Sequence, residues 1–151
     1  MPMRSLLLGL SFIPAFAYAV STQTILNQTD GEQIIAAGES VALSLKAPVC
    51  IAVVDQSGLL LAFKRMDNAP PGCIDSSILK ARSAALYRAP TVGFMERANG
   101  KEPSISTLPG MVPLGGGTPV LVSGRVVGAV GVSGSANPNE VSISIKAADR
   151  S

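Results

Sequence analysis

Three adjacent glycines, Gly115, Gly116 and Gly117, stand just before a predicted hairpin and constrain the fold more than any other feature of this sequence. Residues 118–123 and 126–133 are two apolar runs joined by a Ser-Gly-Arg turn, which is the pattern of paired antiparallel strands. Glycine brings no side chain and loses more backbone entropy on folding than any other residue, so three in a row require a reason. Two reasons stay open: a tight strand crossover in a small sheet, or a backbone wall that a ligand approaches closely.

Length and composition indicate one compact domain and exclude several functions. The chain has 151 residues, of which 47% are hydrophobic and 15% charged, so it can form a single core and is too apolar to be disordered. A net charge of +2 and the absence of Trp argue against a nucleic-acid surface. The glycines match no nucleotide-binding fingerprint. The sequence contains no His, which excludes Ser-His-Asp, Cys-His and His-based zinc chemistry.

The first residues have the pattern of an export signal. A positive start at Arg4 is followed by an apolar core too short to span a bilayer and by the cleavage pattern Ala17-Tyr18-Ala19. A proline within the apolar core argues against the alternative, a core helix of the fold. We therefore expect a signal peptide at residues 1–19, a linker at 20–28 and one domain at 29–151. The mature chain is expected in the periplasm or secreted, with no membrane span.

Capping residues and hydrophobic periodicity place the other elements. Thr29 and Glu32 have capping-box spacing, so the first helix is expected to begin there. Asn137 and Pro138 mark the start of a final helix, although alternating apolar residues keep a strand open as the alternative. We expect helices at residues 29–45, 75–88 and from 137 onward, and strands at 49–55, 59–65, 118–123 and 126–133. A short helical turn is expected from 91 through 94, with Asn99-Gly100 closing it.

The two cysteines are candidates for a disulfide. Cys50 lies at the start of a predicted strand, and Cys73 lies in the loop before the second helix. An even number of cysteines in an exported protein favours pairing. Closing a loop of this length would remove unfolded-state entropy worth about 3 kcal/mol. Because the spacing is not C-x-x-C, we predict a structural bond and not a redox motif.

Two charged residues are candidates for ligand contacts. Asp67 follows a predicted strand and precedes a Pro-Pro-Gly loop, a position that brings side chains to the rim of a sheet. Lys80 lies on the second helix among small residues, which leave room for a ligand. For both residues a plain surface role is the alternative. The apolar residues that predict the buried face of this helix are Ile78, Leu79, Ala81, Ala85 and Leu86.

Several motifs together resemble the GlcG/HbpS-like family of haem-binding proteins, which is related to the C-terminal domain of PduO-type proteins. The motifs are PVCIAVVD at 48–55, LLAFKRMD at 60–67, KARSAA at 80–85 followed by Pro90-Thr91, LPG at 108–110, PLGGGTP at 113–119 and VGAVGVSG at 127–134. They occur in the family's order and cover about residues 30–148. The resemblance implies an α+β, profilin-like fold, in which helices pack on an antiparallel sheet of about five strands. It also implies a homo-oligomer.

The resemblance further implies haem as a possible cofactor. No His is present to serve as an axial ligand, and the residues that could approach an iron are Met66, Tyr87, Thr91, Met95 and Met111. Glu140 is the counterpart of an acidic residue that the family carries after its Ser-Gly turn. The residues before it, Asn137-Pro138-Asn139, depart from the family's pattern.

Two classes of function follow. The first is an exported protein that binds haem or a similar planar, anionic small molecule but no nucleic acid. The second is a small-molecule enzyme, an isomerase or lyase, in which Asp67 or Glu140 is the base and Lys80 stabilises charge. The candidate ligand-binding residues are Met66, Asp67, Lys80, Thr91, Gly115, Gly116, Gly117 and Glu140. We expect no resident metal site built from protein ligands.

Overall fold

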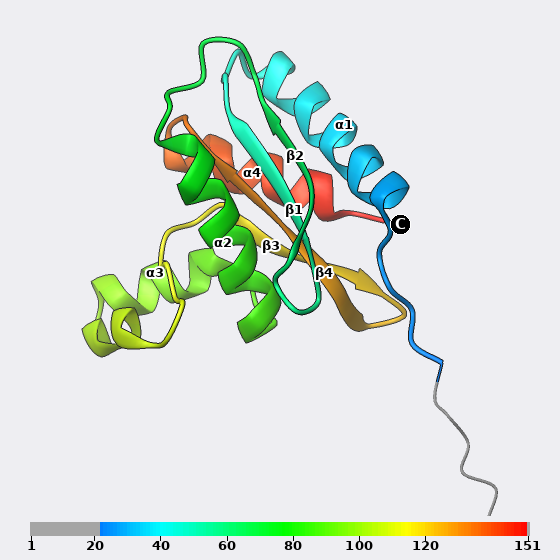
Figure 1. The fold of residues 1–151 in the computed structure, drawn as a ribbon. Coiled ribbons are helices and arrows are strands. Elements are labelled where there is room, and N and C mark those ends of the chain that lie inside the picture. Colours follow the sequence, from blue (N-terminus) through cyan, green and yellow to red (C-terminus); the bar gives the residue numbers. More distant parts are fainter. Residues whose placement is uncertain (1–21, 151) are drawn as a thin grey trace, which may run out of the picture.

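The computed structural model describes residues 22–150 as a four-stranded antiparallel sheet with helices on both faces (Figure 1). The sheet has the order β2-β1-β4-β3. This confirms the predicted α+β class, with four strands where about five were expected. The elements are α1 (Gln28–Ser44), β1 (Cys50–Asp55), β2 (Leu60–Arg65), α2 (Cys73–Tyr87), α3 (Thr91–Asn99), the 3-10 helix η1 (Pro103–Thr107), β3 (Gly117–Val122), β4 (Arg125–Ser133) and α4 (Asn137–Ala148).

Strand β1 lies in the interior of the sheet, between β2 and β4. Successive side chains of a strand point to opposite faces, so each face takes alternate residues. Ile51 and Val53 belong to the core beneath one face, and Ala52 and Val54 to the core beneath the other. Because helices cover both faces, β1 reads in the sequence as an almost continuous apolar run.

Helices α1 and α4 cover the first face. Ile34 of α1 and Ile143 of α4 are fully buried against the sheet. Gly38 lets the two helices and the sheet come close, because a Cβ there would lie 3.1 Å from Cδ1 of Ile51 and 3.2 Å from Cβ of Ala147.

Helix α2 covers the second face through small side chains. Ala81, Ala84 and Ala85 pack against Ala52 and other small residues of the sheet. The helix lies so close to β4 that a Cβ on Gly131 would meet the backbone oxygen of Ser77.

The predicted buried face of α2 was partly wrong. Leu79 and Leu86 are 41% and 45% exposed, whereas Lys80 is only 2% exposed. The close approach to the sheet leaves space for alanine and serine and none for leucine, so the large apolar side chains turn outward.

The structure corrects several element boundaries. Helix α1 is capped by Asn27 and not by Thr29, because Asn27 accepts from the backbone of Asp30 while Asp30 accepts from the backbone of Asn27, both at 3.0 Å. The helical turn predicted at 91–94 is the longer helix α3, which ends at Asn99 with Gly100 as its C-cap, as the Asn99-Gly100 pair predicted. The 3-10 helix η1 follows it and was not predicted. The final segment is a helix, as favoured. The predicted signal peptide, residues 1–19, lies outside the described residues. No helix within residues 22–150 is long and apolar enough to cross a membrane.

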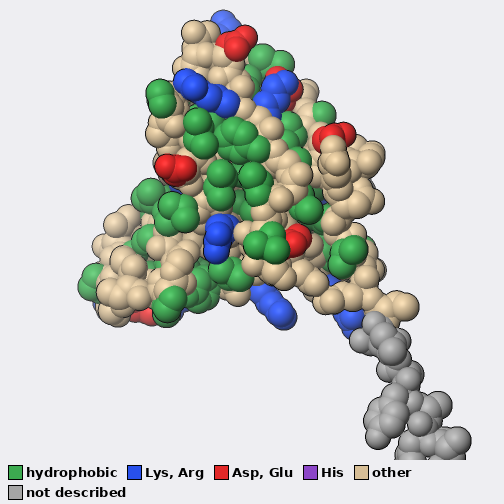
Figure 2. Space-filling view, in the orientation of Figure 1, with side chains coloured by type: hydrophobic (Ala, Val, Ile, Leu, Met, Phe, Trp, Pro, Cys, Tyr) green, Lys and Arg blue, Asp and Glu red, His purple; other side chains and the backbone are tan. Residues whose placement is uncertain are grey.

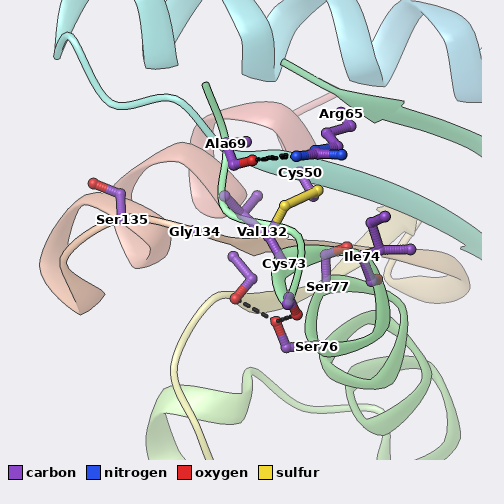
Figure 3. Close-up of a disulfide and its surroundings, with 12 residues drawn as sticks. Cys50, Arg65, Ala69, Cys73, Ile74, Ser76, Ser77, Val132, Gly134 and Ser135 are labelled. Atoms are coloured by element: carbon purple, nitrogen blue, oxygen red, sulfur yellow. Dashed lines mark hydrogen bonds between the residues drawn. A yellow bond between two sulfur atoms is a disulfide. The ribbon is translucent and has the colours of Figure 1, made fainter. Parts of the chain in front are cut away.

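A disulfide joins Cys50, the first residue of β1, to Cys73, the first residue of α2, with an S–S distance of 1.98 Å (Figure 3). Both sulfurs lie in a small buried cluster with Ala69. The carbonyl oxygen of Ala69 accepts from Nε and Nη2 of Arg65, at 3.1 and 2.8 Å. The loop between β2 and α2 is therefore held at both ends.

The contact between α2 and β4 predicts opposite effects for two glycine substitutions. Gly131→Ala places a methyl group against the backbone of α2 and should lower the free energy of unfolding by about 1–3 kcal/mol, the usual cost of overpacking. Gly93→Ala lies in helix α3 with no atom within 4 Å of the added carbon, so it should stabilise the protein by about 0.5–1 kcal/mol. Urea denaturation of both variants measures the difference. Equal stabilities for the two would contradict the packing described.

Candidate functional site

The structure separates the eight predicted ligand-binding residues into two places. Lys80, Thr91, the three glycines and Glu140 lie together where α2, β3 and the start of α4 meet. Met66 and Asp67 line a groove at the end of α1 instead. We call the first place the buried pair, after Lys80 and Glu140, and the second the α1 groove.

The buried pair is an ion pair inside the protein. Nζ of Lys80 lies 2.8 Å from Oε2 of Glu140, and the two side chains are 3% and 7% exposed. The ammonium also donates to the carbonyl oxygen of Val132 at 3.2 Å and to Oγ of Ser133 at 3.5 Å. Lys80 is therefore neither a surface lysine nor a free cation facing solvent.

The carboxylate of Glu140 is fully hydrogen-bonded. Its Oε1 accepts from the backbone N–H groups of Gly134 and Ser135, at 2.8 and 3.2 Å. Its Oε2 accepts from Lys80 and, at 3.1 Å, from Nδ2 of Asn137. A carboxylate has about four acceptor positions, so these partners use all of them. Glu140 also lies in the first turn of α4, where the helix dipole favours a negative charge.

The three glycines face protein atoms on the side where a side chain would be. A Cβ on Gly115 would lie 2.6 Å from Cγ2 of Val141. One on Gly116 would lie 2.6 Å from the carbonyl oxygen of Val132 and 3.4 Å from Nζ of Lys80, and one on Gly117 would meet the carbonyl oxygen of Lys80. Gly116 also has a φ of 115°, which favours glycine. This geometry favours the first of the two reasons open from the sequence, a tight crossover.

Thr91 completes this region. Its Oγ1 accepts from the backbone N–H of Gly117 at 2.8 Å.

Within residues 22–150, no buried side-chain nitrogen or oxygen lacks a hydrogen-bond partner. A general base needs a lone pair within reach of the substrate proton, and a carboxylate with four internal donors has none to offer. The buried pair is thus built to hold α2, β4 and α4 together.

The α1 groove lies between the C-terminal end of α1 and the residues that follow β2. It has a volume of about 670 Å³, within the range of about 300–1,000 Å³ typical of small-molecule sites. Lys and Arg side chains gather over this end of the molecule (Figure 2). The lining residues are Glu39, Ala42, Leu43, Lys46, Ala47, Pro48, Lys64, Arg65, Met66, Asp67 and Asn68.

The three cations of the groove are held differently. Nζ of Lys64 lies 2.7 Å from Glu39, and the guanidinium of Arg65 is directed to the carbonyl oxygen of Ala69. Lys46 follows the C-cap of α1 in the left-handed region, with a φ of 51°. It is exposed and forms no ion pair within the described residues.

The sequence offers few ligands for a haem iron, and the structure places one of them in the groove. The chain has no His, and both cysteines form the disulfide. The hydroxyl of Tyr87 donates to the carbonyl oxygen of Pro109, and the sulfur of Met95 accepts from the backbone of Gly115. Met66 alone of the five residues considered lines the α1 groove. No group of three Cys, Asp or Glu residues in the described part of the chain could hold a metal ion.

Sequence reasoning missed Glu39 and Lys46 in the groove and Ser133 and Asn137 around the buried pair. Nothing in the local sequence distinguishes Glu39 and Lys46 from other charged residues of a solvated helix. The burial of Lys80 did leave a signal, because Ser77, Lys80, Ala81 and Ala84 follow the i, i+3, i+4, i+7 spacing of one helix face.

Comparisons with known proteins agree on one family. The family model described as "Haem degrading protein HbpS-like" matches residues 26–149. Protein GlcG of Escherichia coli K12 is 44% identical over 114 residues, which cover 76% of this chain and 85% of that protein. An HbpS double mutant from Streptomyces reticuli superposes with a TM-score of 0.79 at 29% identity, covering 91% of this chain and 96% of the other. The PduOC:heme complex shares the fold, with a TM-score of 0.73 at 24% identity over 84% of this chain and 96% of the other.

The buried pair predicts a large loss of stability when one charge is removed. Glu140→Gln leaves the ammonium of Lys80 buried without a counter-charge, and breaking such a pair costs about 3–5 kcal/mol. Adding Lys80→Met removes the unpaired charge and should recover part of the loss. Chemical denaturation of the single and double variants measures both effects.

The matched control is the exposed pair of Arg97 and Glu102, whose atoms lie 2.6 Å apart. The hydrogen bond from Arg97 lowers the pKa of Glu102 below its ordinary value, but both side chains are about half exposed. Glu102→Gln should therefore leave the melting temperature nearly unchanged. A loss of stability for Glu140→Gln as small as that for Glu102→Gln would show that the buried pair does not stabilise the packing of α2, β4 and α4.

Proposed function

Because the chain belongs to the HbpS-like family, we propose that it binds haem or a similar planar, anionic small molecule in the α1 groove. The family model's description names haem, and the α1 groove has the size and chemistry for such a ligand. The observation that carries the proposal is the combination of an apolar wall with cations at its edge.

The two sides of the groove suit the two parts of such a molecule. Leu43 and Pro48, with the buried Ala42 and Ala47 beneath them, form an apolar wall for a flat ring system. Leu43 is 63% exposed, so covering it removes apolar surface from water. The charges at the edge suit carboxylates, with Lys46 as the cation that forms no ion pair within residues 22–150.

Haem is an apolar ring that carries acidic groups, and the residues of the groove suit both parts of it. Met66 lies in the wall and would hold the iron through its thioether, a ligand found in cytochromes. When bound, haem would supply redox chemistry, whereas the residues of this chain would bind and orient it. Asp67 lies at the rim of the same groove and forms no ion pair within residues 22–150.

The disulfide supports export as the setting of this function. Bonds of this kind form and persist in oxidising compartments such as the periplasm. The Cys50–Cys73 bond therefore agrees with the signal peptide expected at residues 1–19, and we propose that the ligand is met outside the cytoplasm.

Titration with hemin tests the proposal. We expect micromolar protein to shift and sharpen the Soret band, and Lys46→Gln to weaken binding about two- to five-fold at low salt, the range for an exposed ion pair. The loss should shrink as salt rises, because exposed charges are screened. Lys101→Gln, an exposed lysine outside the groove, is the matched control and should bind like the wild type.

A second variant separates ring binding from iron ligation. Met66→Leu keeps the side-chain volume and removes the sulfur. It should change the position of the Soret band and leave the affinity for iron-free protoporphyrin unaltered. No spectral response from the wild type, or equal affinities for Lys46→Gln and Lys101→Gln, would refute the groove as the haem site.

A further inference from the structure

Glu39 and Lys64 form an ion pair across the α1 groove. Glu39 comes from α1 and Lys64 from β2, so the pair joins the two walls. Nζ of Lys64 lies 2.7 Å from each oxygen of Glu39. The two side chains are 44% and 27% exposed, for Lys64 and Glu39 respectively, so water can replace either partner.

An exposed pair of this kind is weak. Measured values for exposed ion pairs are about 0.2–1 kcal/mol, because water and salt compete with the contact. The buried pair of Lys80 and Glu140 is different, since its charges are almost completely removed from solvent. A carboxylate of a ligand can therefore replace Glu39 as the partner of Lys64, whereas the buried pair cannot be exchanged in this way.

Glu39 forms no ion pair with either of the other two cations of the groove. Arg65 donates through two nitrogens to the carbonyl oxygen of Ala69, which anchors the loop after β2. Lys46 forms no ion pair within the described part of the chain. A first carboxylate of a ligand is thus met by Lys46, and a second one finds Lys64 already neutralised.

We infer that Glu39 and the second carboxylate of the ligand compete for Lys64, so that Glu39 limits the affinity of the groove for ligands with two carboxylates. The inference rests on the proposed function and names the ligand class more closely: an apolar ring with two carboxylates on one edge. When a ligand with two carboxylates binds, its second carboxylate only replaces the ion pair of Glu39 and Lys64, so this contact adds little to the free energy of binding. A ligand without the second carboxylate leaves the pair of Glu39 and Lys64 intact.

The test compares hemin with hemin dimethyl ester, which lacks both negative charges. Glu39→Gln frees Lys64 and keeps the helix-forming tendency of the position. It should tighten hemin binding about two- to five-fold, the range that corresponds to an exposed ion pair, and leave the affinity for the diester unchanged. The gain should disappear when Glu39→Gln is made in a Lys64→Gln background.

Asp67→Asn is the matched control for charge alone. Asp67 also lines the groove, but it forms no ion pair within residues 22–150. A gain equal to that of Glu39→Gln, or a gain that persists without Lys64, would overturn the competition. So would a Glu39→Gln variant that binds hemin like the wild type. If no variant and no wild-type protein bind hemin, the proposed function itself fails, so the two failures are distinguishable.

Discussion

The ion pair between Lys80 and Glu140 is the interaction on which the arrangement of this fold depends. Removing two charges from water is costly, and the cost is offset only when every donor and acceptor finds a partner. Those partners come from separate elements: Val132 and Ser133 at the end of β4, the turn at Gly134 and Ser135, and Asn137 at the start of α4. The pair can therefore form only when α2, β4 and α4 are in their final positions.

The close packing of the elements around the pair explains the glycines that dominate the sequence. A Cβ on Gly115 would meet Val141, one on Gly116 would meet the carbonyl oxygen of Val132, and one on Gly117 would meet the backbone of Lys80, so the chain entering β3 has no room for side chains there. Gly131 meets the same limit on β4, where α2 lies against the sheet. Close packing and a buried charge together leave a rigid centre, whereas the charges of the α1 groove stay exposed and exchangeable.

The sequence predicted those parts of the fold that depend on local chemistry. The Ser-Gly-Arg turn gave the hairpin of β3 and β4, and Asn137 with Pro138 gave the start of α4. The cap of α1 was misplaced because two capping boxes overlap, and Asn27 with Asp30 forms the one that the structure uses. Which sheet edge or helix end lies beside which loop depends on tertiary packing, so the α1 groove, with Glu39 and Lys46, could not be predicted. Lys80 was predicted to contact a ligand or solvent, and not to be buried, because its charge outweighed the helical spacing that it shares with Ser77 and Ala84.

A crystal structure of the protein with hemin would test the central claim directly, namely that the exposed groove binds the ligand and the buried pair only stabilises the fold. The account predicts the ring against Leu43 and Pro48, with one carboxylate at Lys46 and the contact between Lys80 and Glu140 unchanged. A ligand lying against Gly115, Gly116 and Gly117, with Lys80 turned from Glu140 toward it, would contradict the account and restore the glycine wall as the site.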